Sequence, residues 1–262
     1  MDVMKIFKFS YSWITDSKSW KWYALLLVLL IVLMGLVAVA FSTPFGTSAL
    51  NREQIEKGVE KVNAGLLGVL IVASMVYSLA VAYVSAEIAI NALSSKNLPT
   101  QPFGFGRFLG YIWLHILGAF YAVFSWYDKR FLVLLGAALA LFLLSFAVPS
   151  ILFLAIIAFI LYGIVFVYNA VRLTVAVPVF LSKKLERTSD ALDESWRITN
   201  KRVIDIIITT VICQLIWGVI MIIPGAIPLV NVLVSPFSNF NGEYIRVGIY
   251  GELAASRGEK ER

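Results

Sequence analysis

The sequence predicts an all-α fold, a polytopic helical membrane bundle, and three observations lead to that class. Of 262 residues, 60% are hydrophobic and only 15% are charged, whereas a soluble domain carries about 25% charged residues. The mean hydropathy is +0.85. Apolar runs of about 20 residues, long enough to cross a bilayer, recur along the chain. These runs are continuous and do not alternate with period two, which excludes a membrane β-barrel.

The chain is expected to form a single membrane domain over 1–262. Residues 1–21 are basic and aromatic, which is typical of an interfacial helix with its rings at headgroup level. The apolar run 22–41 is longer than the 7–15 residues of a signal peptide and predicts an uncleaved first span. A polar loop with a short helix is expected over 42–64. The later segments are apolar runs at 66–90, 108–126, 131–147, 150–181, 203–223 and 229–250, a charged segment at 182–202 and a charged tail at 254–262.

The distribution of Lys and Arg conflicts with seven crossings. With the N-terminus inside, seven spans would leave 182–202, with its six Lys and Arg residues, outside, against the positive-inside rule. The conflict disappears if 108–126 is a re-entrant or interfacial helix. We therefore expect about six transmembrane helices in the cell membrane, with both termini cytoplasmic.

The charged segment 182–202 holds ten charges in 21 residues. Ser189 or Asp190 is the expected N-cap of a cytoplasmic amphipathic surface helix over 190–199, lying on the inner membrane surface. Two interpretations stay open, a topology anchor between two spans and a docking surface for a partner or for anionic lipid headgroups. The candidate binding residues are Lys183, Lys184, Arg187, Trp196, Arg197 and Arg202.

Ionisable or amide residues within the apolar runs are costly in lipid and are functional candidates by default. Arg172 is the most notable, because a straight helix would place it about 15 Å below the charged segment. We expect it to pair with Asp205 or Glu243. The bland alternatives are that Glu87 reaches the interface, that His115 is a packing residue and that Arg172 forms a structural ion pair. The full candidate set is Glu87, His115, Asn169, Arg172, Asp205 and Arg246.

Ala191, Ser195, Trp196 and Thr199, with Arg172 upstream, form an A-x-x-x-S-W-x-x-T pattern. This pattern resembles the membrane domain associated with glycerophosphodiester phosphodiesterases and related uncharacterised bacterial and archaeal multi-pass families. The C-terminal stretch with Tyr244 and Arg246 is similar to the closing segment of that family. The chain departs from the family at 200–202, where Asn-Lys-Arg stands in place of a Gly before a basic or aromatic residue. The resemblance implies that catalysis in the fused proteins belongs to a separate soluble domain, which this sequence does not contain.

Motifs of catalysis are missing from the sequence. One histidine and one cysteine form no metal cluster, and neither a phosphate-binding loop nor a nucleophile elbow occurs. We expect no enzyme activity, no cofactor, no metal and no nucleic-acid partner.

Three functional classes remain from the sequence, of which a membrane-embedded enzyme is the least favoured. The first is a scaffold, assembly or docking component that contacts lipid, a protein partner or a second copy of the chain. The alternative is a transporter, channel or lipid-moving protein with a polar path near Arg172, Asp205 and Asn169. A hydrated cavity lined by Arg172 and Asp205 would favour the alternative, and a dry core with a patch around Trp196 would favour the first.

Overall fold

The fold is all-helical in the part of the chain that the computed structural model describes, residues 1–42, 64–124, 130–226 and 228–258. No strand occurs within these residues, so the predicted fold class is confirmed. The expected loop at 42–64 lies almost wholly outside them. The helices are α1 (Val3–Ser10), α2 (Ser17–Ser42), α4 (Ala64–Ser95), α5 (Phe105–Val123), α6 (Arg130–Ser145), α7 (Leu152–Arg172), α8 (Ala176–Ser182), α9 (Thr188–Thr199), α10 (Val203–Ala226) and α11 (Pro228–Ala255), with 3₁₀ turns η1 (Ser12–Thr15) and η2 (Pro149–Ile151).

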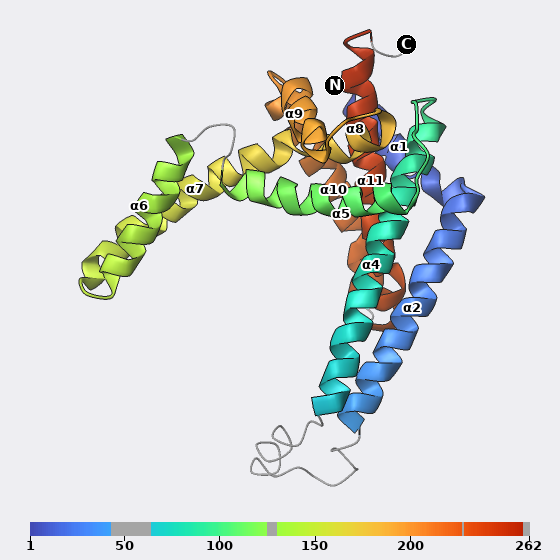
Figure 1. Cartoon of the computed structure of the whole chain (residues 1–262), viewed down its shortest axis with the longest axis horizontal. Helices are drawn as coiled ribbons and strands as arrows, with labels where there is room; N and C mark the ends of the chain where they lie inside the picture. Colours follow the sequence, from blue (N-terminus) through green and yellow to red (C-terminus); the bar gives the residue numbers. More distant parts are fainter. Residues whose placement is uncertain (43–63, 125–129, 227, 259–262) are drawn as a thin grey trace.

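Four stretches are long and apolar enough to cross a membrane. Their apolar side chains face outward around most of the helix, which is typical of helices surrounded by lipid. In α2 and α4, which run side by side (Figure 1), most residues beyond the packed end are exposed. Helix α6 is apolar but shorter than these stretches. The structure therefore indicates a membrane protein with four candidate spans among the described residues. The four stretches are Ser17–Val37, Gly68–Ser95, Pro149–Ser182 and Val203–Ile222.

Helix α5 lies across the long axis of α4 and does not run parallel to it (Figure 1). It passes from α4 to α7 and also packs against α8 and α9. Its buried residues Tyr111 and Leu114 face these neighbours. Helix α5 is not among the four stretches above, and the expectation that 108–126 is re-entrant or interfacial stays a prediction.

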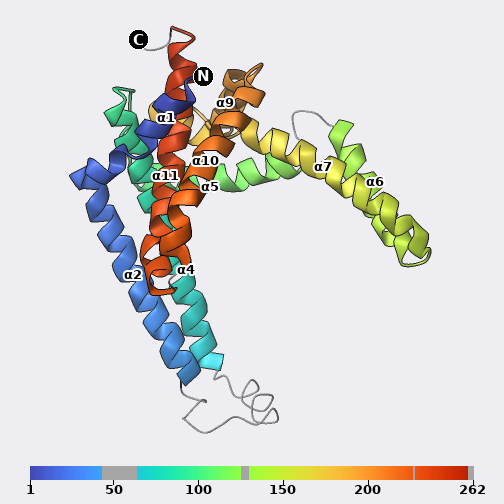
Figure 2. The same ribbon diagram turned by 180° about the vertical axis from the view of Figure 1, so that it is seen from behind.

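The expected single run 150–181 is two helices. Helix α7 ends at Arg172, and after a short turn α8 begins at Ala176 with all seven of its residues buried. With α6, helix α7 forms a hairpin that projects away from the other helices (Figures 1 and 2). We call this hairpin, residues 130–172, the arm.

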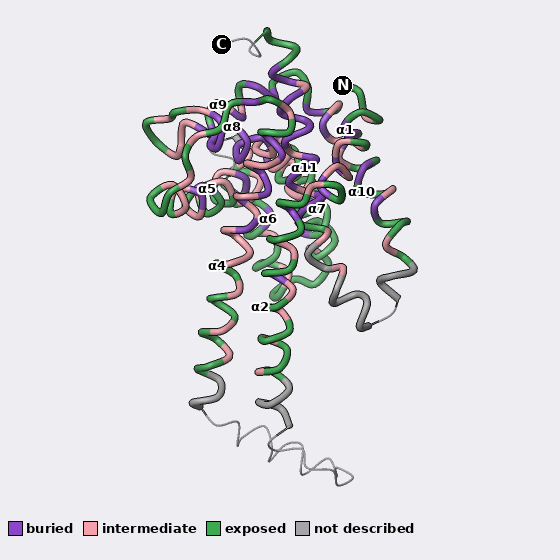
Figure 3. The backbone as a smooth tube through the Cα atoms, turned by 90° about the vertical axis from the view of Figure 1, so that its right-hand side faces the viewer, coloured by how far each residue is buried: buried purple, intermediate pink, exposed green. Residues whose placement is uncertain are grey.

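The buried residues gather at the end of the molecule where both described ends of the chain lie (Figures 2 and 3). We call the helices there, α1, α8, α9 and the last turns of α11, the cap. The C-terminal part of α11 is almost fully buried in the cap, with Tyr244, Val247 and Ile249 at 0% exposure. The cap therefore holds a packed protein core, whereas the apolar stretches of α2 and α4 have few buried residues.

The aromatic N-terminus, expected as an interfacial helix, packs several of its rings into this core. Asp2 caps α1 by accepting a hydrogen bond from the Lys5 N–H at 3.0 Å. Trp13 is 1% exposed and packs edge-on against Phe240, with ring centroids 5.4 Å apart. The ring of Phe9 packs on Tyr244. The rings thus anchor α1 to α11.

The end of the chain is also held by the cap. Lys5 and Glu252 form an ion pair of 3.1 Å between α1 and α11. Arg257 donates a hydrogen bond of 2.9 Å to the carbonyl oxygen of Arg197 at the end of α9. The predicted tail 254–262 therefore begins as the last turn of a packed helix, and its residues 259–262 lie outside the described part.

Candidate functional site

Arg172 holds the joint between the arm and α9. Its guanidinium carbon lies 3.6 Å from the centroid of the Trp196 ring, and Nη2 donates a 2.7 Å hydrogen bond to the Trp196 carbonyl oxygen. The ring of Tyr168 stands edge-on to that of Trp196. A guanidinium stacked on an indole and bonded to a helix carbonyl is a strong local attachment.

Two hydroxyl groups of α9 complete this joint. Ser195 Oγ donates a 2.8 Å hydrogen bond to the carbonyl oxygen of Arg172, and Thr199 Oγ1 lies 3.2 Å from the same oxygen. The last carbonyl groups of a helix have no partner within the helix, so these hydroxyls satisfy the end of α7. The S-W-x-x-T spacing places Ser195, Trp196 and Thr199 on one face, and here that face serves a structural joint.

The expected partners of Arg172 are wrong. Asp205 pairs with Arg202 at 3.0 Å, and Glu243 pairs with Arg246 at 2.8 Å. The depth expected for Arg172 is also wrong, because α7 ends at this residue and places it beside α9. Its aromatic partner was missed because the contact depends on the break between α7 and α8.

Helix α9 begins earlier than expected. Arg187 is the N-cap residue, and its N–H donates a 2.9 Å hydrogen bond to the carboxylate of Asp190, now in the first turn. The buried face of α9 packs on α8, α5 and α7, so its apolar side contacts protein and does not lie on lipid. That face consists of Ala191, Leu192, Ser195, Ile198 and Thr199.

Glu194 lies at the centre of an ion-pair cluster on the cap. Its carboxylate binds Arg197 at 2.7 Å and Lys183 at 2.9 Å. The hydrogen bond from Arg197 is the main cause that lowers the pKa of the Glu194 carboxyl to about 2, and Lys183 adds to it. Lys183, expected as a binding residue, ties the end of α8 to α9, and Arg197 pairs with Glu194 within α9.

Of the predicted binding surface, Lys184 and Arg187 are exposed and their side chains form no ion pair within the described residues. Arg202 is exposed but paired with Asp205, and Trp196 is half-buried under Arg172. The predicted surface is therefore divided into residues that hold the cap together and residues that face outward.

The remaining candidates lie in separate places. Glu87 is half-buried in α4 and interacts with Tyr83 one turn earlier. Asn169, which is 1% exposed, donates a 3.4 Å hydrogen bond to the Ala122 carbonyl oxygen and links α7 to α5. His115 Nδ1 lies 3.0 Å from the Tyr111 carbonyl oxygen.

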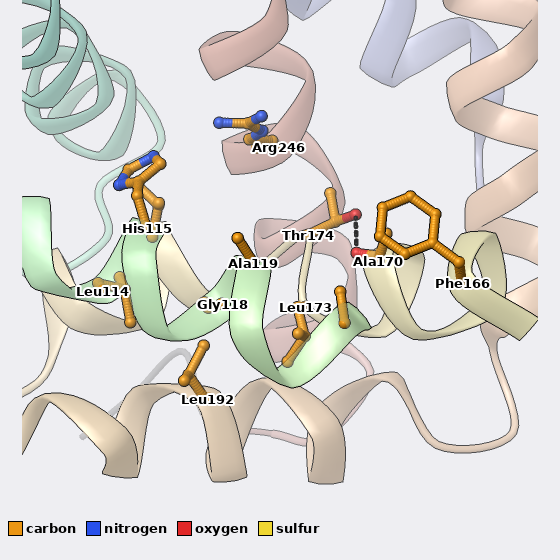
Figure 4. A pocket seen from close by; sticks show the side chains of 13 residues that line it. Leu114, His115, Gly118, Ala119, Phe166, Ala170, Leu173, Thr174, Leu192 and Arg246 are labelled. Atoms are coloured by element: carbon orange, nitrogen blue, oxygen red, sulfur yellow. Dashed lines mark hydrogen bonds between the residues drawn. The ribbon is translucent and has the colours of Figure 1, made fainter. Parts of the chain in front are cut away.

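His115 and Arg246 line two cavities on either side of α5. One is an apolar cavity of about 250 Å³ between α5, α7 and α8, where Leu192 of α9 closes one side (Figure 4). In that view His115 and Arg246 lie near its upper edge. The other is a polar cleft of about 540 Å³ between α4, α5, α10 and α11. Asn169, Arg172 and Asp205 line neither cavity.

We call the second cavity the polar cleft. Sequence reasoning named His115, Arg246 and Glu243 but assigned Glu243 to Arg172. Its i,i+3 spacing to Arg246 on the same helix was the signal for the pair that the structure shows. The other groups are single polar residues on three helices, whose meeting depends on the fold. The polar lining is Ser78, Ser85, His115, Gln214, Ser238, Asn239, Glu243 and Arg246.

The described residues contain no group of three His, Cys, Asp or Glu side chains suited to a metal ion. Compared with protein-family models, curated proteins and solved structures, the chain matches none. The resemblance of 191–199 to the phosphodiesterase-associated membrane domain therefore stays a prediction.

Proposed function

We propose that the chain is a non-enzymatic integral membrane protein whose cap acts as a docking component on anionic lipid at the cytoplasmic surface. The observation that carries this proposal is the division of the basic residues. Lys183 and Arg197 form ion pairs with Glu194 of α9, and Arg202 forms one with Asp205 of α10. Lys184 and Arg187 remain exposed at the outside of the cap. Unpaired cations at a membrane surface attract anionic headgroups.

The topology belongs to the same proposal. Both described ends of the chain and α9 lie at the cap (Figure 2), as six crossings with cytoplasmic termini require. In this proposal α5 is the segment that does not cross, and its direction across that of α4 (Figure 1) supports this assignment. The hairpin of α6 and α7 supplies two of the six crossings, and its tip near Val148 faces the outside of the cell.

A transporter with a path near Arg172, Asp205 and Asn169 is disfavoured. The three side chains are held in three different contacts, with Trp196, with Arg202 and with the Ala122 carbonyl oxygen. None of the three lines either of the two cavities beside α5, so these cavities offer no path past them.

The lipid proposal is tested by thermal unfolding of the protein in nanodiscs. The wild type is expected to be more stable in discs with anionic phosphatidylglycerol than in phosphatidylcholine, because each cation near an anionic surface contributes about 1 kcal/mol. The double variant Lys184→Gln, Arg187→Gln should lose most of this difference. High salt should reduce it in the wild type by screening.

Lys183→Gln is the matched control. It removes a cation that binds Glu194, so its stability should fall equally in both lipids. If the double variant retains the full lipid difference, the outward cations do not bind the membrane.

A further inference from the structure

The polar cleft carries charges that the surrounding helices do not satisfy. Glu243 is 6% exposed, and its Oε1 binds Arg246 while its Oε2 has no hydrogen-bond partner. An unpaired carboxylate oxygen shielded from water costs free energy comparable to a lost charged hydrogen bond. The carboxylate therefore has capacity for one more donor.

Arg246 has the complementary capacity. Its side chain is 40% exposed, and among the contacts within the described residues it forms one ion pair, from Nη1 to Glu243. A guanidinium presents five N–H donors, and most of these remain for an acceptor such as a phosphate. His115 of α5 adds an imidazole to the same cleft.

One wall of the cleft is formed by α4, which is long and apolar enough to cross the membrane. The lining residues of α4 are Ser78, Val81, Ala82 and Ser85, at the i, i+3, i+4, i+7 spacing of one helix face within the apolar stretch Gly68–Ser95. The neighbouring apolar cavity shares His115 and Arg246 with it. A ligand here meets polar groups on one side and apolar groups on the other, which suits an amphiphile.

Charge balance selects the class of headgroup. Glu243 and Arg246 together are neutral, so an anionic ligand would leave net charge in a low-dielectric site, which is costly. A zwitterion keeps the site neutral, with its phosphate on Arg246 and its cation on Glu243. The free Oε2 needs an N–H donor, which a primary ammonium has and a quaternary ammonium lacks.

We propose that the polar cleft binds the headgroup of a zwitterionic phospholipid that carries a primary ammonium group. The phosphate accepts hydrogen bonds from Arg246, and the ammonium donates to Glu243 Oε2 and to the amide oxygens of Gln214 or Asn239. The acyl chains lie along the apolar cavity and the lipid-facing helices. This site is separate from the outward cations Lys184 and Arg187.

The test is native mass spectrometry in detergent of the delipidated full-length double variant Lys184→Gln, Arg187→Gln, which lacks the proposed anionic-lipid surface, titrated with phosphatidylethanolamine, phosphatidylcholine and phosphatidylglycerol. We expect phosphatidylethanolamine to bind at least about tenfold more tightly than the other two, since one charge-assisted hydrogen bond distinguishes them. Equal binding of phosphatidylcholine, or a preference for phosphatidylglycerol, would overturn the proposal.

Gly242→Leu tests the location. A Cβ atom at Gly242 would have no protein atom within 4 Å, and Gly242 lines the cleft, so a leucine there should occupy part of the cleft. Phosphatidylethanolamine binding should fall at least about tenfold. Gly163→Leu on the arm, which also meets open space, is the matched control and should bind as the wild type does.

A second variant covers the case in which Gly242→Leu fails to fold. Gln214→Leu changes an exposed lining residue of α10 and should weaken phosphatidylethanolamine binding severalfold. The double variant Lys184→Gln, Arg187→Gln should leave binding in the cleft unchanged, which separates this site from the proposed cap surface. Unaltered binding in both cleft variants would contradict the proposal.

Discussion

At the scale of single residues, the α7–α9 joint explains why Arg172, Ser195, Trp196 and Thr199 occur together. The guanidinium of Arg172 stacks on the indole of Trp196. The hydroxyl groups of Ser195 and Thr199 donate hydrogen bonds to the carbonyl oxygen of Arg172. The pattern therefore reports a joint between two helices and does not by itself indicate a binding site.

Arg172→Lys should lower the free energy of unfolding by about 2 kcal/mol. Lysine keeps the charge but loses the planar stack on Trp196 and the geometry of the hydrogen bond to its carbonyl oxygen. Denaturant unfolding in detergent micelles measures the effect. Arg202→Lys, at an exposed ion pair, should change stability by less than about 0.5 kcal/mol, and equal losses in the two variants would refute the joint.

The carboxyl group of Glu194 predicts an acid dependence of the cap. Its pKa is lowered from 4.5 to about 2 in the folded protein. A carboxyl with a depressed pKa stabilises the fold fully above the unfolded value and loses that contribution as the pH falls toward the folded value. The stability difference between the wild type and Glu194→Gln should therefore shrink between pH 4.5 and 2.

Melting temperatures of the two proteins over that pH range provide the measurement. Near neutral pH the wild type should melt at the higher temperature, because the ion pairs with Lys183 and Arg197 are intact. A difference that stays constant from pH 6 down to 2 would show that Glu194 does not titrate in this window.

At the scale of elements, α5 depends on a close approach to α8. A Cβ atom at Gly110 would lie 2.9 Å from Phe180 Cζ, and Arg107 is held against the same ring and donates a 2.9 Å hydrogen bond to the Lys183 carbonyl oxygen. The ring has little room to move, because Phe180 is 7% exposed. The glycine thus permits the crosswise path of α5.

Gly110→Ala should lower the free energy of unfolding by about 1–3 kcal/mol, the usual cost of overpacking. Gly106→Ala in the same helix meets open space and should be neutral or stabilising by up to about 1 kcal/mol, since alanine favours the helix. Denaturant unfolding distinguishes the two. If both substitutions stabilise the protein, α5 does not approach α8 this closely.

Element boundaries show what the sequence could and could not predict. The apolar run 203–223 corresponds closely to α10 (Val203–Ala226), because continuous apolar composition is a strong signal. The break at Arg172 was missed because residues 173–175 are as apolar as their neighbours. The turn is stabilised by contacts with α9, more than 20 residues away, which no local pattern contains.

At the scale of the whole molecule, composition predicted the membrane class and the charges predicted that α5 differs from the other apolar segments. The candidate sites were less predictable. The polar cleft joins α4, α5, α10 and α11 across more than 150 residues, and the partners of Arg172 and Glu243 depend on how these helices meet. Isolated polar residues in a sequence do not indicate which of them will be neighbours.

The orientation of the cap in the membrane is the central claim, and labelling of single cysteines in intact cells tests it most directly. The native Cys213 is 1% exposed and should not react. With a membrane-impermeant maleimide, Ala147→Cys at the tip of the arm should be labelled, and Asn200→Cys at the end of α9 should react only after the cells are opened. Labelling of Asn200→Cys in intact cells would contradict the account.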